Sequence, residues 1–124
     1  VISVGAYNHY TQGMYIDSGR GYTPDERVKP DIVAPGVNVY GTRAGGGYTT
    51  KSGTSVAAAH VAGAAALFLS WGVTQRNALR IGNSEIKSLL IRGARRDVGQ
   101  NFPNRQQGYG KLDVFQSFNQ LRIY

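Results

Sequence analysis

A serine stands at the start of the most apolar segment of the chain. Residues 53–63 read Gly-Thr-Ser-Val-Ala-Ala-Ala-His-Val-Ala-Gly, and residues 64–69 continue this run of small and apolar side chains. The composition predicts a helix over residues 55–69 that is buried on most of its surface. The first N–H groups of a helix have no partner within it, and the helix dipole makes that end positive. Ser55 therefore stands where an oxyanion formed during acyl transfer would be stabilised.

The ordinary alternative for Ser55 is a helix cap, because Ser and Thr are preferred at helix starts. A nucleophilic serine also needs a base, usually a histidine oriented by a carboxylate. His60 is five residues further along the same helix. At 100° per residue its side chain points about 140° away from that of Ser55. His60 is therefore excluded as the base.

Four segments resemble the subtilisin-like serine proteases (subtilases), and they occur in the family's order. They are a strand at residues 1–6, Lys-Pro-Asp-x-x-Ala-Pro-Gly at residues 29–36, the nucleophile motif at residues 53–63, and a Gly-x-Gly segment at residues 108–113. The resemblance implies that residues 1–124 are a single partial domain, the C-terminal part of a subtilase catalytic domain. It implies an α/β, three-layer fold with a mostly parallel sheet and flanking helices.

The resemblance also implies roles for the residues around the nucleophile. Ser55 would be the nucleophile, and its backbone N–H would be one oxyanion donor. Gly53 permits a tight turn and close approach of a substrate. Thr54 would place a hydroxyl near the oxyanion, although capping the helix is an equally good role for it. Lys51 and Ser52 stand where the family contacts the leaving-group side of the substrate.

Other motif residues are expected to be structural. His60 is a packing residue in the resemblance, Pro35 and Gly36 close an apolar strand, and Asp31 belongs to the structural Lys-Pro-Asp segment. His9 lies in a polar stretch and is expected to be exposed.

The remaining catalytic groups of the family are not matched in this sequence. The family's base His, orienting Asp and oxyanion Asn lie in segments that precede those seen here, and Asp17, Asp25 and Asp97 hold no triad position. The 124 residues alone are therefore expected to be inactive. The parent protein is expected to be a serine endopeptidase. A pseudoprotease or regulatory binding module of the same fold is the alternative.

Two departures from the family pattern affect the motif. Ala59 replaces the usual Pro, which restores a helix N–H, and Val56 replaces an oxidisable Met. The Ala-Ala-Ala-His variant resembles the clostridial spore-germination branch of the family. This implies an extracellular or spore-associated parent, and that branch includes members that have lost triad residues.

The composition of the chain argues against several other classes of function. The chain is 41% hydrophobic and 17% charged, which argues against disorder, and it has no Cys. The net charge of +7 leaves a basic polyanion-binding domain as a remote alternative, but the basic residues form no continuous run, so no nucleic-acid partner is expected. The longest apolar run, residues 61–69, is too short to span a bilayer, so no membrane partner is expected.

No cofactor is identified. The family's calcium ligands are scattered through loops, and no compact carboxylate cluster stands in this sequence, so calcium is left open for the parent protein. The expected partners are a peptide or protein substrate and the N-terminal portion of the same domain. A central sheet cut partway would expose an edge, so self-association of the 124 residues is also expected.

The remaining elements follow from local patterns. Strands are expected at residues 1–7, 15–17, 32–34 and 37–40, with a glycine-rich loop tip at residues 44–47. Trp71 and Gly72 should end the first helix. Asn83 or Ser84 should cap a second helix through about Arg92, and Asp113 a third, with a loop over residues 101–110 between them.

Overall fold

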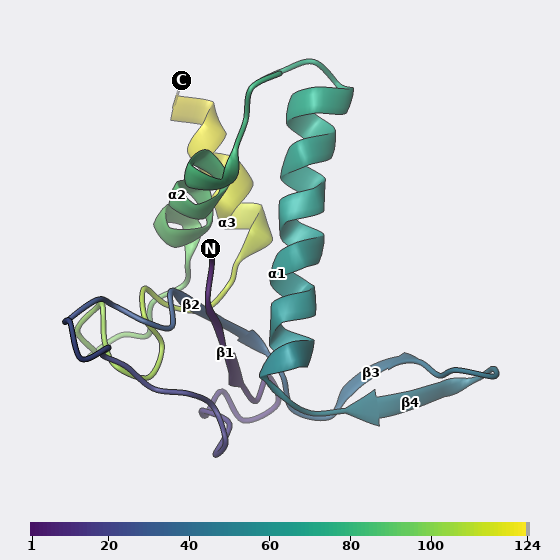
Figure 1. Cartoon of the computed structure of the whole chain (residues 1–124), viewed down its shortest axis with the longest axis vertical. Coiled ribbons are helices and arrows are strands. Elements are labelled where there is room, and N and C mark those ends of the chain that lie inside the picture. Colours follow the sequence, from purple (N-terminus) through teal and green to yellow (C-terminus); the bar gives the residue numbers. More distant parts are fainter. Residues whose placement is uncertain (124) are drawn as a thin grey trace.

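The computed structural model describes the backbone of residues 1–123 and the side chains of residues 1–121. It contains four strands, three α-helices and two short helical turns. In chain order these are β1 (Val4–Tyr7), β2 (Ile32–Pro35), β3 (Val39–Thr42), β4 (Tyr48–Lys51), α1 (Thr54–Leu69), η1 (Ser70–Thr74), α2 (Asn83–Gly93), α3 (Val114–Asn119) and η2 (Gln120–Ile123). The α/β class expected from the sequence is confirmed (Figure 1).

Strands β1 and β2 pair in parallel, with Val4 opposite Ile32 and Tyr7 opposite Pro35. The strands expected at residues 1–7 and 32–34 are thus confirmed. Residues 15–17 do not form the expected strand, because only Met14 bridges to Tyr7 there. Parallel strands are stable only when helices cover them, and α1 packs against both.

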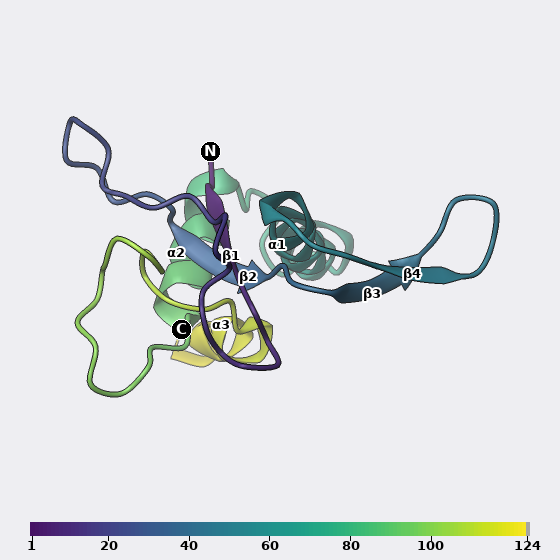
Figure 2. The ribbon, with the colours of Figure 1, turned by 90° about the horizontal axis from the view of Figure 1, so that it is seen from below.

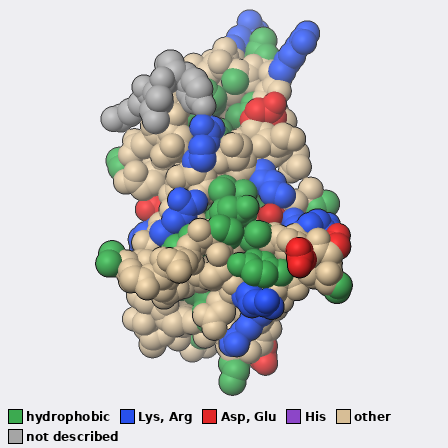
Figure 3. All heavy atoms as spheres, turned by 90° about the vertical axis from the view of Figure 1, so that its left-hand side faces the viewer, with side chains coloured by type: hydrophobic (Ala, Val, Ile, Leu, Met, Phe, Trp, Pro, Cys, Tyr) green, Lys and Arg blue, Asp and Glu red, His purple; other side chains and the backbone are tan. Residues whose placement is uncertain are grey.

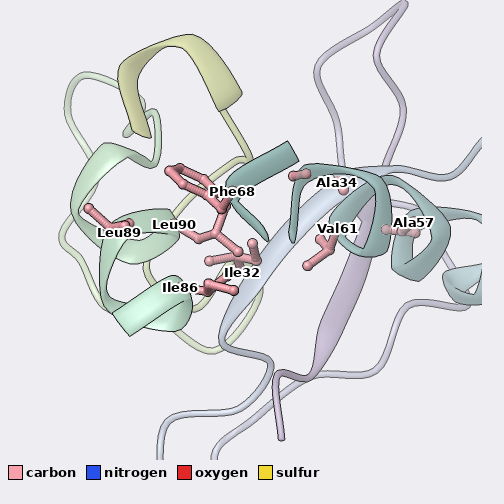
Figure 4. Close-up of a cluster of buried hydrophobic side chains, with 10 residues drawn as sticks. Ile32, Ala34, Ala57, Val61, Phe68, Ile86, Leu89 and Leu90 are labelled. Carbon is pink, nitrogen blue, oxygen red and sulfur yellow. The ribbon is translucent and has the colours of Figure 1, made fainter. Parts of the chain in front are cut away.

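The core lies where α1, α2 and the strand pair meet (Figure 4). Ile32 and Phe68 are fully buried and lie close to the apolar face of α2. The Phe68 ring stacks on Phe118 of α3, with 4.1 Å between ring centroids. The complete set of buried hydrophobic residues in this cluster is Ala6, Ile32, Ala34, Ala57, Val61, Ala64, Phe68, Ile86, Leu89 and Leu90.

Strands β3 and β4 form an antiparallel hairpin that projects from the body of the molecule (Figures 1 and 2). Residues 44–47 form its tip, as expected, with Gly45, Gly46 and Gly47 all at positive φ. The sequence predicts a strand at residues 37–40 but none after the glycine-rich tip, so β4 and its pairing with β3 are not predicted.

The helix expected over residues 55–69 is confirmed as α1, which ends at Leu69, but Trp71 and Gly72 do not end the helical structure, because the π-helical turn η1 continues it to Thr74. Gly72 is tolerated there because it is buried against Ile81, where an added Cβ would lie 2.7 Å from a side-chain carbon. The combined segment, Thr54–Thr74, is long and apolar enough to cross a bilayer by length and composition. This apolar helical segment is therefore longer than the run of residues 61–69 on which the sequence-based exclusion of a membrane span rested. Helix α1 packs against β1 and β2, but only Ala57, Val61, Ala64 and Phe68 in it are buried, so the expectation that most of its surface is buried is wrong for the described residues.

The caps of the two later helices differ from each other in how well the sequence predicted them. Asp113 caps α3 as expected, and its Oδ1 accepts a hydrogen bond from Gln116 N at 2.9 Å. The cap of α2 is Gly82 rather than Asn83 or Ser84. The Glu85 side chain accepts a bond from Gly82 N at 3.1 Å and so does the work that a side-chain cap would do.

The basic residues are dispersed over the surface. On the face shown in Figure 3, the Lys and Arg side chains lie between uncharged areas and some acidic ones. No single positive stripe of the kind that follows a nucleic-acid backbone appears on this face.

Candidate active site

Ser55 lies in the first turn of α1 and is exposed. The carbonyl of Gly53 accepts hydrogen bonds from Val56 N at 3.2 Å and Ala57 N at 3.3 Å. The backbone N–H groups of Thr54 and Ser55 have no recorded hydrogen bond to any described residue. The turn therefore presents a hydroxyl and unpaired N–H groups on one exposed helix end.

Two glycines fix this turn against the end of β2. Gly53 has φ 145°, a conformation that glycine adopts without a steric penalty, and its N–H donates to Gly36 O at 2.8 Å. An added Cβ on Gly36 would lie 2.5 Å from the Ala6 Cβ and 2.7 Å from Gly53 O. The buried sheet and the nucleophile turn thus meet through backbone contact. Pro35, the last residue of β2, pairs with Tyr7 beside this contact.

The residues just before the turn are exposed and come from the hairpin. Lys51 ends β4 and is exposed. The Ser52 hydroxyl accepts a hydrogen bond from Asn38 N at 2.8 Å. Asn38 was missed by the sequence analysis. The residue type gives a sequence signal for this turn, because Asn tolerates the left-handed conformation that Asn38 adopts here, with φ 49°.

Thr54 is half-buried and lines a cavity of about 430 Å³ beside the helix start. This volume is in the range of small-ligand sites. The cavity is lined by Ser3, Val4, Gly5, Gly19, Arg20, Gly21, Tyr22, Thr23, Pro24, Lys29, Pro30 and Thr54. Thr54 thus joins the nucleophile turn to a concave surface.

Neither histidine is brought to the Ser55 hydroxyl by a recorded contact. His60 is half-buried, and its Nδ1 lies 3.1 Å from Val56 O, so the ring is held by its own helix. His9 is half-buried rather than exposed, so the expectation for its exposure was wrong. Its ring lies against Tyr10, at 4.0 Å between centroids.

Asp31 is buried at the start of β2 and is 3% exposed. It accepts bonds from Ser3 N at 2.7 Å and Lys29 Nζ at 2.8 Å, and it pairs with Lys87 at 3.2 Å. Burial opposes the charged carboxylate, but the bonds from Lys29, Ser3 and Lys87 outweigh it and hold the pKa of Asp31 below its usual value. The carboxylate charge of Asp31 thus pairs with lysines within the fold, in agreement with the structural role expected from the sequence.

The other acidic candidates are also engaged by cations. Asp97 pairs with the buried Lys111 at 3.1 Å, and Asp25 pairs with Arg27 at 2.9 Å on the surface. Desolvation of Asp97 is outweighed by its bonds from Lys111 and Gln107, so its pKa is lowered. Across the described residues, no group of three metal-ligating side chains is assembled.

The comparisons with known proteins point to one family. The subtilase family's profile matches residues 1–110. The chain is 39% identical over 130 residues to the membrane-bound transcription factor site-1 protease of Mus musculus, covering 100% of this chain and 12% of that protein. It is 43% identical over 77 residues to a subtilisin of Bacillus pumilus, covering 62% of this chain and 26% of that protein.

The structure is similar to that of the Clostridium perfringens CspB protease, with a TM-score of 0.94 and 40% identity. The match covers 100% of this chain and 27% of that protein. The chain thus spans about a quarter of the CspB protease and about an eighth of the site-1 protease.

Proposed function

The chain belongs to the subtilase family, and we propose that it is the C-terminal part of a serine endopeptidase domain whose nucleophile is Ser55. The observation that carries the proposal is the exposed hydroxyl of Ser55 at a helix start whose first N–H groups have no recorded partner. The N-cap of α1 is Gly53 and no side-chain cap bond is made, so neither Ser55 nor Thr54 has the capping role that the sequence left open for it.

In the proposed reaction, Ser55 gives its proton to a base and its Oγ attacks the carbonyl carbon of a peptide bond. The N–H of Ser55 stabilises the oxyanion that forms. Collapse of this intermediate breaks the C–N bond, and the base returns the proton to the leaving amine. Water then hydrolyses the acyl-Ser55 ester by the same steps.

The base must come from outside these 124 residues. His60 is held by the Val56 carbonyl of its own helix, and Asp31 is bound to two lysines within the fold. We assign the base, its orienting carboxylate and a second oxyanion donor to the N-terminal portion of the same domain.

The neighbouring residues shape the site in this proposal. Gly53 keeps the turn tight, and Thr54 offers a hydroxyl near the oxyanion and faces the cavity beside the helix start. Lys51 and Ser52 stand on the leaving-group side, with Ser52 fixed by Asn38. The substrate class is a peptide or protein.

The N-terminal portion is also the partner that the fold requires. Leu67 is 54% exposed on α1, and several small residues of the same helix are exposed beside it, namely Ala58, Ala59, Ala62, Gly63 and Ala66. A core helix with this much apolar surface in water favours association. We therefore expect the 124 residues to self-associate when alone, which sedimentation velocity would detect as concentration-dependent species.

An extracellular or spore-associated location is proposed for the parent protein. It rests on the similarity to the Clostridium perfringens CspB protease and on the Ala-Ala-Ala-His sequence at residues 57–60. No cofactor is assigned to the described residues, and calcium binding would involve the rest of the domain.

The test is a Ser55→Ala substitution in the complete catalytic domain, assayed on casein. We expect activity to fall by roughly a thousandfold or more, because the covalent step is lost. Ser70→Ala, in the exposed first position of η1 directly after α1, is the matched control and should retain activity. Retained activity in Ser55→Ala would show that another residue is the nucleophile.

Two further outcomes separate the alternatives. The 124-residue chain alone should not hydrolyse casein, because it lacks the base. A complete domain that folds but neither hydrolyses peptides nor reacts with serine-directed reagents would instead support the pseudoprotease reading.

A further inference from the structure

A cavity outside the candidate active site lies beyond the C-terminal end of α1, at the other end of the helix from Ser55. It has a volume of about 900 Å³ and is lined by Trp71, Arg76, Asn77, Ala78, Leu79, Arg80, Ile81, Ser84, Glu85, Ser88, Leu89, Arg92 and Leu121. Ser55 and Trp71 are separated by sixteen residues of helix, which is roughly 24 Å at 1.5 Å per residue. The cavity is therefore separate from the proposed active site.

The walls of this cavity are mostly apolar. Trp71, Ile81 and Leu121 are half-buried, and Ile81 and Leu121 pack against the core. Leu79 is 65% exposed beside them. A second, smaller cavity of about 390 Å³ shares Trp71 and Leu121, so the indole and this leucine border both spaces. Such a surface suits the apolar body of a ligand.

The segment that forms the outer wall is held by its own hydrogen bonds. Asn77 Nδ2 donates to Trp71 O at 2.9 Å, Ala78 N donates to Gly72 O at 3.0 Å, and Ile81 N donates to Ala78 O at 3.1 Å. An added Cβ on Gly72 would lie 2.9 Å from Ala78 O. The wall is therefore shaped before any ligand arrives.

The charges around the cavity are unbalanced. Its lining contains three arginines and one acidic residue, Glu85, whose carboxylate already accepts a bond from Gly82 N. Arg76 and Arg80 have no recorded side-chain hydrogen bond or ion pair with any described residue. Two unpaired guanidinium groups on an apolar cavity favour a ligand that carries a negative group.

We propose that this cavity binds a small amphipathic anion, with an apolar ring or chain body and one carboxylate or sulfonate. The body lies against Trp71 and Leu79, and the anionic group lies toward Arg76 and Arg80. The proposal does not depend on the role of Ser55, so failure of one would leave the other untouched.

The probe is 1-anilinonaphthalene-8-sulfonate, an aromatic monoanion whose emission rises in an apolar site. Trp71 is the only tryptophan of the chain, so quenching of its fluorescence reports binding beside it. We expect saturable binding to one site with quenching of Trp71. The uncharged analogue N-phenyl-1-naphthylamine should bind at least about tenfold more weakly.

Matched variants distinguish the contribution of the arginine charges to binding from that of the shape of the cavity. Arg76→Glu with Arg80→Glu should weaken binding at least about tenfold, while Arg27→Glu with Arg43→Glu, an equal charge change on distant exposed residues, should leave it within about twofold. Ser88→Phe would fill the cavity without changing its charge and should also abolish binding. Circular dichroism would verify that each variant is folded.

The proposal is overturned if the control pair weakens binding as much as the Arg76 and Arg80 pair, or if Ser88→Phe binds normally. Calorimetry with the complete catalytic domain gives a further decisive outcome. Binding there supports the site, whereas absence of binding would mean that another part of the parent protein fills the cavity.

Discussion

The two strand pairs of the molecule have the same length but opposite surroundings. β1 and β2 are parallel and almost fully buried, and Ile32 is 0% exposed. β3 and β4 are antiparallel and project into solvent, where Tyr40 is 68% and Tyr48 62% exposed (Figure 2). Parallel pairs need cover on their faces and antiparallel pairs do not. The parallel pair thus belongs to the buried core, whereas the neighbouring antiparallel pair lies outside it in solvent.

Both pairs lead to the same turn. Gly36 directly follows β2, Gly53 lies two residues after β4, and the hydrogen bond between their backbones joins the two pairs two residues before Ser55. The buried pair should therefore set the stability and the position of the turn, whereas the hairpin should set its access.

Ile32→Ala should destabilise the chain most, by about 2–5 kcal/mol, because it opens a cavity in the core between α1 and α2. Ile16→Ala is the matched control, since Ile16 is 82% exposed, and it should change stability by less than about 0.5 kcal/mol. Urea unfolding followed by Trp71 fluorescence measures both. Equal effects of the two substitutions would contradict the described core.

Gly36→Ala should cost about 1–3 kcal/mol, because its Cβ would overlap Ala6 and the Gly53 carbonyl. It should also lower peptidase activity of the complete domain, since the overlap displaces the turn that holds Ser55. Gly41→Ala, in the hairpin where nothing lies within 4 Å, is the control. A Gly36→Ala domain with unchanged stability and activity would break the link between β2 and the turn.

Asp31 should make stability depend on pH. Its pKa is lowered in the folded chain, so its contribution is present above the unfolded value near pH 4 and is lost as the pH falls through the folded value. Asp31→Asn should remove about 1–3 kcal/mol at pH 7 and flatten the decline in stability on acidification. Unfolding measured from pH 7 to pH 3 would reveal this. If the stability of the variant declined with falling pH as steeply as that of the original chain, the acid sensitivity would come from other groups.

Tyr40→Ala should have the smallest effect, about 1 kcal/mol or less on global unfolding. The two tyrosine rings stack at 5.2 Å between centroids, but both are exposed on a hairpin outside the core. The same substitution at the buried Tyr7 of β1 should cost several times more. A large loss in Tyr40→Ala would mean that the hairpin contributes to the core.

The sequence predicted most of this architecture where local chemistry and tertiary structure agree. The Asp113 cap, the glycine-rich tip and the apolar strand before Pro35 all follow from residue types. The bounds of α1 follow as well, but its continuation through Gly72 as η1 does not, because packing of Gly72 against Ile81 overrides the preference of glycine to end helices.

The candidate site was predicted only in part for a related reason. The Ser55 turn is local and has a motif, whereas the contact of Gly36 with Gly53 and the bond from Asn38 to Ser52 join residues far apart in the sequence. The cavity beside Trp71 depends on how the segment after α1 folds back over α2, which no short pattern encodes.

The nucleophile is tested most directly by covalent labelling of the complete catalytic domain with a fluorophosphonate, followed by peptide mapping. The account predicts one adduct, on the peptide that contains Ser55, and no adduct in the Ser55→Ala variant. Labelling of a different residue, or labelling that persists in Ser55→Ala, would contradict it.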